Sequence, residues 1–187
     1  MTTVISDTSP VNYLVLIGQI DLLPALYTKV LIPDQVLEEL RAPGSPPAVS
    51  AWAAVLPLWI EVVLTPPDPR ESLLDAGEQA AITLAESLGG DVLLIMDDAA
   101  GRAEATRRGF RITGTLGVLR AAAQQHQLDI AVTLDSLSRT NFYLPPRLVA
   151  FLLAEARSRK PSKNQSIRAT RPSPHPKQKI FPDPRAS

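Results

Sequence analysis

Short runs of aliphatic and β-branched residues alternate with longer segments of helical periodicity along the first 113 residues of this chain. Such alternation is typical of βα units, in which each extended run joins a parallel sheet and the following helix packs on that sheet. We therefore predict an α/β fold with a central, mainly parallel sheet of about four to five strands. The extended runs are "TVIS" at 3–6, "KVLI" at 29–32, "IEVVL" at 60–64, "DVLLIM" at 91–96 and "FRIT" at 110–113.

The segments between these runs carry helix start and stop signals. From 75 to 90, "DAGEQAAITLAESLGG" places its apolar residues on one stripe, and the two glycines end the helix. Gly109 likewise ends a helix predicted over 97–109. Further helices are predicted over Val11–Ile17, over 33–40, around Trp52, and in a helical C-terminal part over 114–158.

The charge of the chain changes sign near Glu155, although the formal net charge is zero. Residues 1–156 contain 10 basic and 18 acidic side chains, whereas residues 157–187 contain 9 basic side chains and 1 acidic one. The second segment has six prolines and three large apolar residues, too few to offset the entropy lost on ordering. We therefore predict one domain over 1–156 and a disordered basic tail over 157–187, which could attract nucleic acid.

The chain has no cysteine, which excludes disulfides and thiolate metal ligands and leaves oxygen atoms as the expected ligands of any metal. No stretch approaches 18 unbroken apolar residues, and Asp7 stands where a signal peptide would be apolar. We therefore expect a cytoplasmic protein that does not enter a membrane.

Acidic side chains follow two of the predicted strands directly. Asp7 comes after "TVIS", and Asp97 and Asp98 come after "DVLLIM". Glu39 lies in the helix after the second strand, and Glu78 lies in the first turn of the helix after the proline-rich loop. Because binding sites in an open parallel sheet lie beyond the carboxyl ends of its strands, these acids are candidates for one site.

Each of these acids also has a purely structural explanation. Asp75 and Glu78 have the D-x-x-E spacing of a capping box, so Glu78 could serve only its own helix. Glu39 and the acid before it could form a solvated helix face. Asp7 and either aspartate of the 97–98 pair could cap the helices that follow them.

A converging set of carboxylates predicts a metal site. Like charges about 4 Å apart repel by roughly 1–4 kcal/mol, so a fold that gathers these acids keeps some of them protonated or binds a divalent cation. Hard carboxylate oxygens favour Mg2+ or Mn2+, and such a site suits phosphodiester hydrolysis. The candidate ligands are Asp7, Glu39, Glu78 and Asp97 or Asp98, and the hydroxyls of Thr8 or Ser9 could orient a water or a phosphate.

Five short motifs occur in order along the chain: "DTSP" at 7–10, "IPDQVLEEL" at 32–40, "LLDAGEQAAITLA" at 73–85, "LLIMDDAAGRAEATRRG" at 93–109 and "GTLGVL" at 114–119. With them the chain resembles PIN-domain proteins, in particular the branch of VapC-like toxins. The resemblance covers most of residues 3–154. It implies a three-layer α/β/α fold and a magnesium-dependent ribonuclease. It further implies the toxin of a toxin–antitoxin pair, with RNA as substrate, an antitoxin protein as partner, and a homodimer.

Carried over by position, the resemblance implies a metal site formed by Asp7, Glu39, Glu78 and Asp97. Adjacent residues leaving a strand point different ways, so we expect Asp97 rather than Asp98 to face the metal. Two further residues could contact substrate near the same edge of the sheet. Arg102 could pair with an acid or a phosphate, and Thr115 could contribute a hydroxyl.

One segment departs from the family pattern. After "DSL" at 135–137, family members tend to carry a glycine-phenylalanine pair, and this chain has "NFYLPP" at 141–146, so the packing and any dimer contact there could differ. The basic tail is also outside the pattern. Because aromatic residues make up only 5% of the chain, we expect RNA recognition through phosphate and shape contacts more than through stacking.

Two other functions stay open at the level of sequence. Phosphatases of the haloacid-dehalogenase type also begin with a strand that ends in aspartate, but they place a second aspartate two residues later, where this chain has Ser9. A degenerate PIN-like domain could keep all the acids and bind RNA or a protein partner without catalysis.

Overall fold

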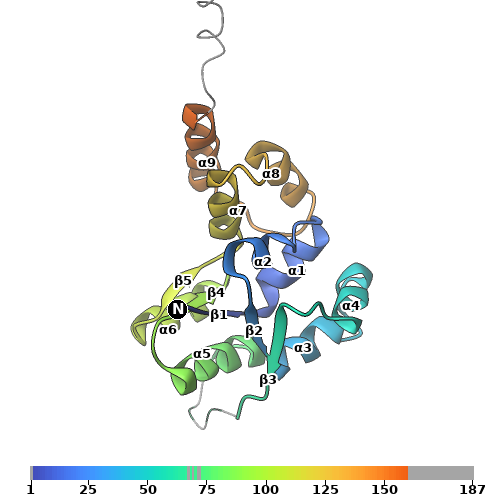
Figure 1. Ribbon diagram of the computed structural model, residues 1–187, viewed down its shortest axis with the longest axis vertical. Helices are drawn as coiled ribbons and strands as arrows, with labels where there is room; N and C mark the ends of the chain where they lie inside the picture. Colours follow the sequence, from blue (N-terminus) through green and yellow to red (C-terminus); the bar gives the residue numbers. More distant parts are fainter. Residues whose placement is uncertain (1, 67, 69, 71–72, 160–187) are drawn as a thin grey trace, which may run out of the picture.

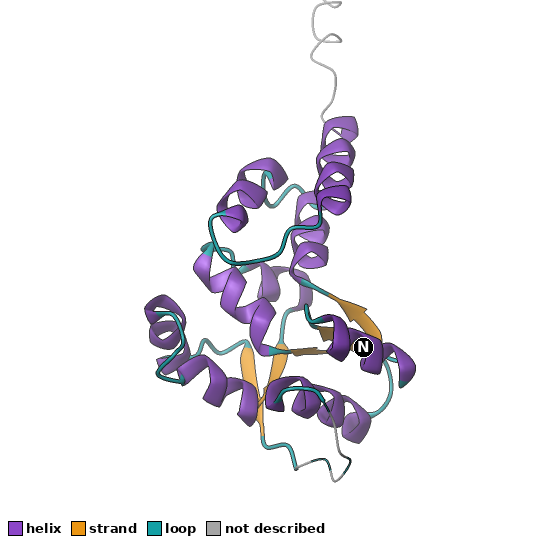
Figure 2. Ribbon diagram, turned by 180° about the vertical axis from the view of Figure 1, so that it is seen from behind, coloured by secondary structure: helices purple, strands orange, loops and turns teal. Residues whose placement is uncertain are grey.

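The computed structural model describes residues 2–66, 68, 70 and 73–159, which form a five-stranded sheet between two layers of helices (Figures 1 and 2). The strand order is β3-β2-β1-β4-β5, and every neighbouring pair is parallel. The predicted parallel sheet and the three-layer arrangement are therefore confirmed. The strands are β1 (Thr3–Ser6), β2 (Val30–Pro33), β3 (Ile60–Val63), β4 (Val92–Ile95) and β5 (Arg111–Thr113).

Nine helices lie within the described residues. Eight of them fall in predicted helical regions, although the helix predicted over Val11–Ile17 begins three residues earlier, at Thr8. The helix Leu22–Tyr27 was not predicted, and its Pro24 lies in the first turn, where the missing N–H breaks no helical hydrogen bond. The helices are α1 (Thr8–Leu16), α2 (Leu22–Tyr27), α3 (Asp34–Arg41), α4 (Pro47–Ala54), α5 (Ala76–Leu88), α6 (Ala99–Arg107), α7 (Thr115–Gln124), α8 (Ile130–Ser138) and α9 (Pro146–Arg159).

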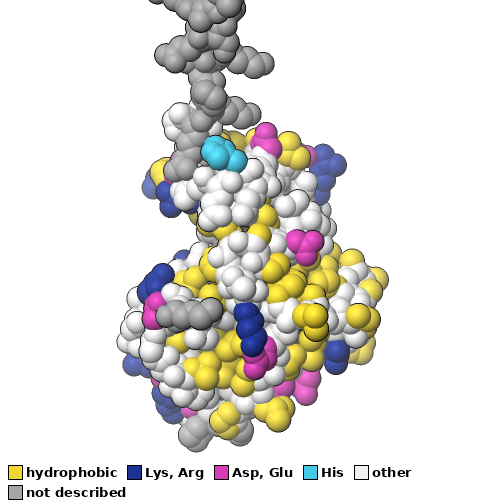
Figure 3. All heavy atoms as spheres, viewed as in Figure 1, with side chains coloured by type: hydrophobic (Ala, Val, Ile, Leu, Met, Phe, Trp, Pro, Cys, Tyr) yellow, Lys and Arg dark blue, Asp and Glu magenta, His cyan; other side chains and the backbone are white. Residues whose placement is uncertain are grey.

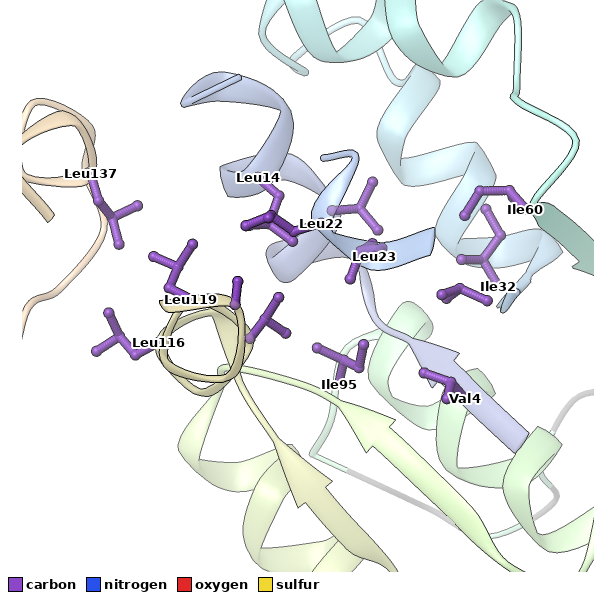
Figure 4. Close-up of a cluster of buried hydrophobic side chains, with 14 of the residues drawn as sticks. Val4, Leu14, Leu22, Leu23, Ile32, Ile60, Ile95, Leu116, Leu119 and Leu137 are labelled. Atoms are coloured by element: carbon purple, nitrogen blue, oxygen red, sulfur yellow. The ribbon is translucent and has the colours of Figure 1, made fainter. Parts of the chain in front are cut away.

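The central strands are buried on both faces. Successive residues of a strand point to opposite sides, so Val4 of β1 packs into one core while its neighbour Ile5 packs into the other. The larger core lies between the sheet and helices α1, α2, α3, α4 and α7, and it continues to Leu137 of α8 (Figure 4). The smaller core holds α5 and α6 against the opposite face. Burial on both faces explains why the run at 92–96 is continuously apolar.

The C-terminal helices gather at one end of the molecule, with α7, α8 and α9 above the sheet in Figure 1. Helix α9 runs to Arg159, so the first three residues of the predicted tail continue this helix. The rest of the predicted disordered tail, residues 160–187, lies outside the described residues. In the part of the chain that the structure covers, no helix is long and apolar enough to cross a membrane.

The strand order places a binding crevice between β1 and β4. From β1 the chain adds β2 and β3 on one side, then crosses over and adds β4 and β5 on the other. Where the order reverses in this way, the connections leave the carboxyl ends of the two central strands in opposite directions and open a crevice. Asp7 follows β1 directly, and its backbone N–H donates to the carbonyl of Ile95, at the end of β4, at 2.9 Å. The first acidic motif therefore lies at this crevice.

Candidate metal centre

Asp7 is buried at the start of α1, with only 2% of its surface exposed. Its backbone has the extended conformation of a helix N-cap, but its side chain makes no capping hydrogen bond to any described residue. The carboxylate oxygen Oδ1 is buried and has no hydrogen-bond partner within the described part of the chain. Buried polar atoms almost always have a partner, so an oxygen left in this state points to a ligand. Capping therefore does not account for the Asp7 side chain.

Glu39 projects from α3 and is held by two donors from other elements. The hydroxyl of Thr8 donates to its Oε2, and the backbone N–H of Gly77, in the first turn of α5, donates to its Oε1 at 2.8 Å. A Cβ at residue 77 would lie 2.6 Å from Glu39 Oε2, so any other residue there would force the Glu39 carboxylate to shift. The predicted solvated-face explanation for Glu39 therefore does not hold. Thr8 orients a carboxylate, whereas the sequence suggested that it orients water or phosphate.

Asp75 and Glu78 form the capping box that their spacing predicts. The backbone N–H of Glu78 donates to Asp75 Oδ1 at 2.8 Å, and the backbone N–H of Asp75 donates to Glu78 Oε2 at 3.3 Å. Asp75 also lies close to two other acids. One oxygen from each of Asp7, Glu39 and Asp75 lies within 4.8 Å of the other two. Glu78 is nearly as buried as Asp7, at 3% exposure, but lies outside this group of three.

Burial and neighbouring negative charges raise the pKa values of Asp7 and Glu78. Burial raises the pKa of Asp7 to about 8, and the negative charges of Asp75, Glu78 and Glu39 add to that effect, while the backbone N–H of Thr8 opposes it. Burial and the charge of Asp75 likewise raise the pKa of Glu78 to about 7. A divalent cation would lower the pKa values of these carboxyl groups, because it favours the charged form of every carboxylate around it. The donor set therefore fits a hard cation.

Asp97, two residues after β4, has both oxygens occupied. Its Oδ1 accepts the backbone N–H of Thr115 at 2.8 Å, and its Oδ2 accepts the Thr115 hydroxyl at 2.5 Å. Burial raises the pKa of Asp97, but these bonds and the charge of Arg102 counteract the rise. Gly114 permits the contact, since a Cβ there would lie 2.6 Å from Asp97 Oδ1. The Thr115 hydroxyl, which we expected to contact substrate, therefore donates to Asp97.

Asp98 lines the same groove as Asp97 but has different partners. It is exposed and caps α6, accepting the backbone N–H groups of Ala100 at 2.7 Å and Gly101 at 3.4 Å. Arg102 donates to the carbonyl of Met96 at 2.9 Å. With Ser9 and Asp97, Arg102 lines a groove of about 640 Å³ beside the acids. The capping explanation therefore applies to Asp98, while Ser9 and Arg102 remain accessible to a substrate.

The structure brings together two of the four predicted metal ligands and adds one that sequence reasoning missed. Asp7 and Glu39 form the group with Asp75, Glu78 of α5 is a charge neighbour of Asp7, and Asp97 lies outside the group beyond the end of β4. The capping-box spacing had already explained Asp75. Its position beside Asp7 and Glu39 depends on how α5 packs against α3, and this packing cannot be predicted from a local sequence pattern.

Residues 3–158 match the family model DUF3368, which describes a PIN domain. The chain belongs to the PIN-domain family. PIN domains are generally metal-dependent nucleases, and the oxygen-rich cluster at the crevice of this PIN domain is consistent with that activity. Comparisons with curated proteins and with solved structures gave no match.

Proposed function

We propose that this PIN domain is a magnesium-dependent endoribonuclease. The observation that carries the proposal is the buried, unpartnered Oδ1 of Asp7, with oxygens of Glu39 and Asp75 close to the same carboxylate. Three acids in this arrangement repel one another, and burial of Asp7 adds a desolvation penalty. A hard divalent cation relieves both effects, and carboxylates at this density are its preferred ligands.

Asp7, Glu39 and Asp75 would hold the cation, with Glu78 and Asp97 at its border. A bound Mg2+ or Mn2+ would lower the pKa of a water and offset the charge that develops on a phosphodiester. The protein supplies the rigidity of this site. Thr8 and Gly77 fix Glu39 from two helices, so the carboxylate needs little reorganisation when the charge in the site changes.

The groove side of the site would position the substrate. Arg102 is half-buried beside Asp97 and can donate further hydrogen bonds to a phosphate oxygen, because a guanidinium has five donors and one carbonyl contact uses only one. The Ser9 hydroxyl lines the same groove. Glu78, with its pKa near 7, can hold a proton at neutral pH and so limits the negative charge next to the phosphate.

RNA cleavage by the full-length protein tests the proposal. RNA labelled internally and blocked at both ends would be incubated with Mg2+ or Mn2+, and we expect internal cuts. Asp7→Asn should lower the rate at least about a hundredfold. Asp135→Asn is the matched control, because Asp135 is an exposed aspartate on α8 that pairs with Arg139. Equal cleavage by wild type and Asp7→Asn, or no cleavage with either metal, would contradict the proposal.

The alternative is a PIN-like domain that binds without cutting. Both oxygens of Asp97 are already hydrogen-bonded, and raised pKa values let Asp7 and Glu78 persist as protonated acids without a cation. RNA that is bound with similar affinity by wild type and Asp7→Asn, and cut by neither, would favour this alternative.

We further propose that the nuclease is the toxin of a toxin–antitoxin pair, acts in the cytoplasm, and forms a homodimer. The order of the five motifs and their VapC-like spacing support this role. A small protein encoded beside the gene should bind the PIN domain and suppress cleavage. Co-expression followed by a cleavage assay would check that expectation, and sedimentation of the purified protein would check the dimer.

A further inference from the structure

The groove beside the acids contains an unusual share of the aromatic side chains of this protein. Four of the nine aromatic residues line it. Tyr143 is 77% exposed and Phe151 is 50% exposed, and no other aromatic side chain in the described ranges is exposed to this degree. The other two groove aromatics are Tyr13 and Phe142. Exposed rings in a groove that also holds Asp97, Asp98 and Arg102 call for a functional explanation.

Contacts within the groove wall hold these rings in place. The ring of Phe142 packs edge to face against Tyr13 of α1, with ring centroids 4.8 Å apart, and the Tyr13 hydroxyl donates to Asn141 at 3.2 Å. These contacts attach the segment 141–146 to α1 and so fix the backbone next to Tyr143. This is the segment "NFYLPP" that departs from the family pattern. The residues that differ from the family pattern therefore form part of the groove wall.

Phe151 is fixed from the opposite wall. The guanidinium of Arg120 lies over its ring, 5.2 Å from the ring centroid. Arg120 in turn donates to Glu155 at 2.8 Å and 3.0 Å. The Phe151 ring is therefore held before a ligand arrives and needs little ordering on binding, which favours affinity.

The charges of the groove argue against a site that recognises phosphate alone. Arg120 is paired with Glu155, and Arg102 lies beside Asp97. Residues 1–156 carry 18 acidic side chains and only 10 basic ones. On the face shown in Figure 3, Lys and Arg side chains are scattered among Asp and Glu. Within residues 1–156, charge therefore offers a polyanion little attraction to this groove, and base stacking on aromatic rings provides a further one.

We propose that Tyr143 and Phe151 form a stacking subsite for unpaired RNA bases next to the cleaved phosphate. The inference rests on the proposed nuclease function and assigns two residues that bind its substrate. Bases in a duplex are stacked on each other and cannot reach the rings, whereas bases of a single strand can. Recognition then depends on stacking to a greater extent than the low aromatic content led us to expect.

Binding and turnover measured together test the subsite. Tyr143→Ala and Phe151→Ala should each weaken binding of a short single-stranded RNA roughly tenfold. Binding would be measured by fluorescence anisotropy in the Asp7→Asn background, so that cleavage does not interfere. In the otherwise wild-type protein, the same substitutions should raise KM by a similar factor and change kcat less than about twofold. Tyr143→Phe and Phe151→Tyr keep a ring and should bind as the parent does.

Val132→Ala is the matched control, because Val132 is a 66% exposed apolar residue on α8 that is not part of the groove. A 2-aminopurine base in the RNA adds a direct readout. Its fluorescence should be quenched on binding to the parent protein, and the quenching should diminish in Tyr143→Ala or Phe151→Ala.

RNA affinity that stays unchanged in both alanine variants would overturn the subsite, even if the protein cuts RNA as proposed. If the same variants instead change the sedimentation of the protein and leave RNA affinity unchanged, the rings belong to a protein contact and the inference is wrong. If the alanine variants lose affinity while the wild type fails to cleave RNA, the subsite stands and the nuclease proposal fails.

Discussion

Asp7 and Asp97 occupy matching places beyond the carboxyl ends of the neighbouring parallel strands β1 and β4, yet their surroundings differ. Asp97 gives both oxygens to one residue, Thr115, and lies beside the positive charge of Arg102. Asp7 is more buried and has other acids as neighbours, and its Oδ1 finds no partner among the residues described. Both oxygens of Asp97 accept hydrogen bonds from the protein, whereas one oxygen of Asp7 accepts none from the described residues.

This difference indicates how the crevice is divided. The β1 side holds Asp7, Glu39 and Asp75, the group of acids that we propose binds a cation. The β4 side, with Asp97 and Arg102, continues into the groove that would receive RNA. Four measurements can test this division.

The largest effect should be a pH dependence of stability in the metal-free protein. Because the pKa of Asp7 is raised from 3.8 to about 8, the folded state binds a proton there that the unfolded state has lost. Stability is therefore highest near pH 4 and falls as the pH rises to 8, by an amount on the order of 5 kcal/mol. Glu78 adds a smaller fall between its ordinary value of 4.5 and about 7. Urea unfolding in EDTA at several pH values measures the slope.

Asp7→Asn should remove most of that slope and should make the metal-free protein more stable than the wild type at pH 8. Asp97→Asn should change the slope less, since Thr115 and Arg102 counteract the rise in the pKa of Asp97. A wild-type stability that rises from pH 4 to pH 8 would show that the Asp7 carboxylate is not desolvated as described.

The next effect is stabilisation by the cation. At a Mg2+ concentration about a hundred times its Kd, the wild type should gain about 2.7 kcal/mol, read as an upward shift of Tm. Asp7→Asn should lose this gain, and Asp97→Asn should keep most of it. If both variants lose it equally, the two aspartates are equivalent ligands and the division of the crevice is wrong.

Gly77 and Gly114 offer a way to perturb each side without removing an acid. A methyl group at residue 77 would lie 2.6 Å from Glu39 Oε2, and one at residue 114 would lie 2.6 Å from Asp97 Oδ1. Each alanine variant should lose up to about 3 kcal/mol of stability. Only Gly77→Ala should also weaken the Mg2+-induced Tm shift. Gly44→Ala is the control, because a Cβ at residue 44 has no described atom within 4 Å.

The smallest effect should come from Thr115→Val, which removes the hydroxyl bonded to Asp97. A hydrogen bond to a charged group contributes about 2 kcal/mol, so the free energy of unfolding should fall by about that amount at neutral pH. Thr133→Val is the control, because its buried hydroxyl donates to a neutral backbone carbonyl, that of Asp129, at 2.9 Å. It should lose about 1 kcal/mol. Equal losses in chemical denaturation would mean that Asp97 is not charged in the folded protein.

The sequence was sufficient to predict the strands and the places of Asp7 and Asp97. A parallel sheet with two buried faces requires long apolar runs, and the residues at the ends of such runs necessarily meet at one edge. Glu39 was also predicted, although on family resemblance, because a helix residue next to another acid is by itself ambiguous.

What the sequence could not show is which acids meet. Asp75 joins Asp7 and Glu39 because the first turn of α5 packs against α3, a contact between residues 38 positions apart that includes the hydrogen bond from Gly77 to Glu39. Local spacing explained Asp75 as a cap, and that explanation is correct but incomplete. Thr8 was similarly placed at the right site, whereas its partner Glu39 depends on tertiary packing.

The place of β1 in the middle of the sheet has a consequence for a ribosome that makes this protein. Asp7, Glu39 and Asp75 have all been synthesised once residue 75 is added, yet Asp7 is fixed by a backbone hydrogen bond to Ile95, at the end of β4. The groove aromatics at 142–151 are added later still. A nascent chain that stops before β4 therefore lacks the strand that holds the Asp7 backbone, and the proposed cation site takes its final form only after β4 has been added.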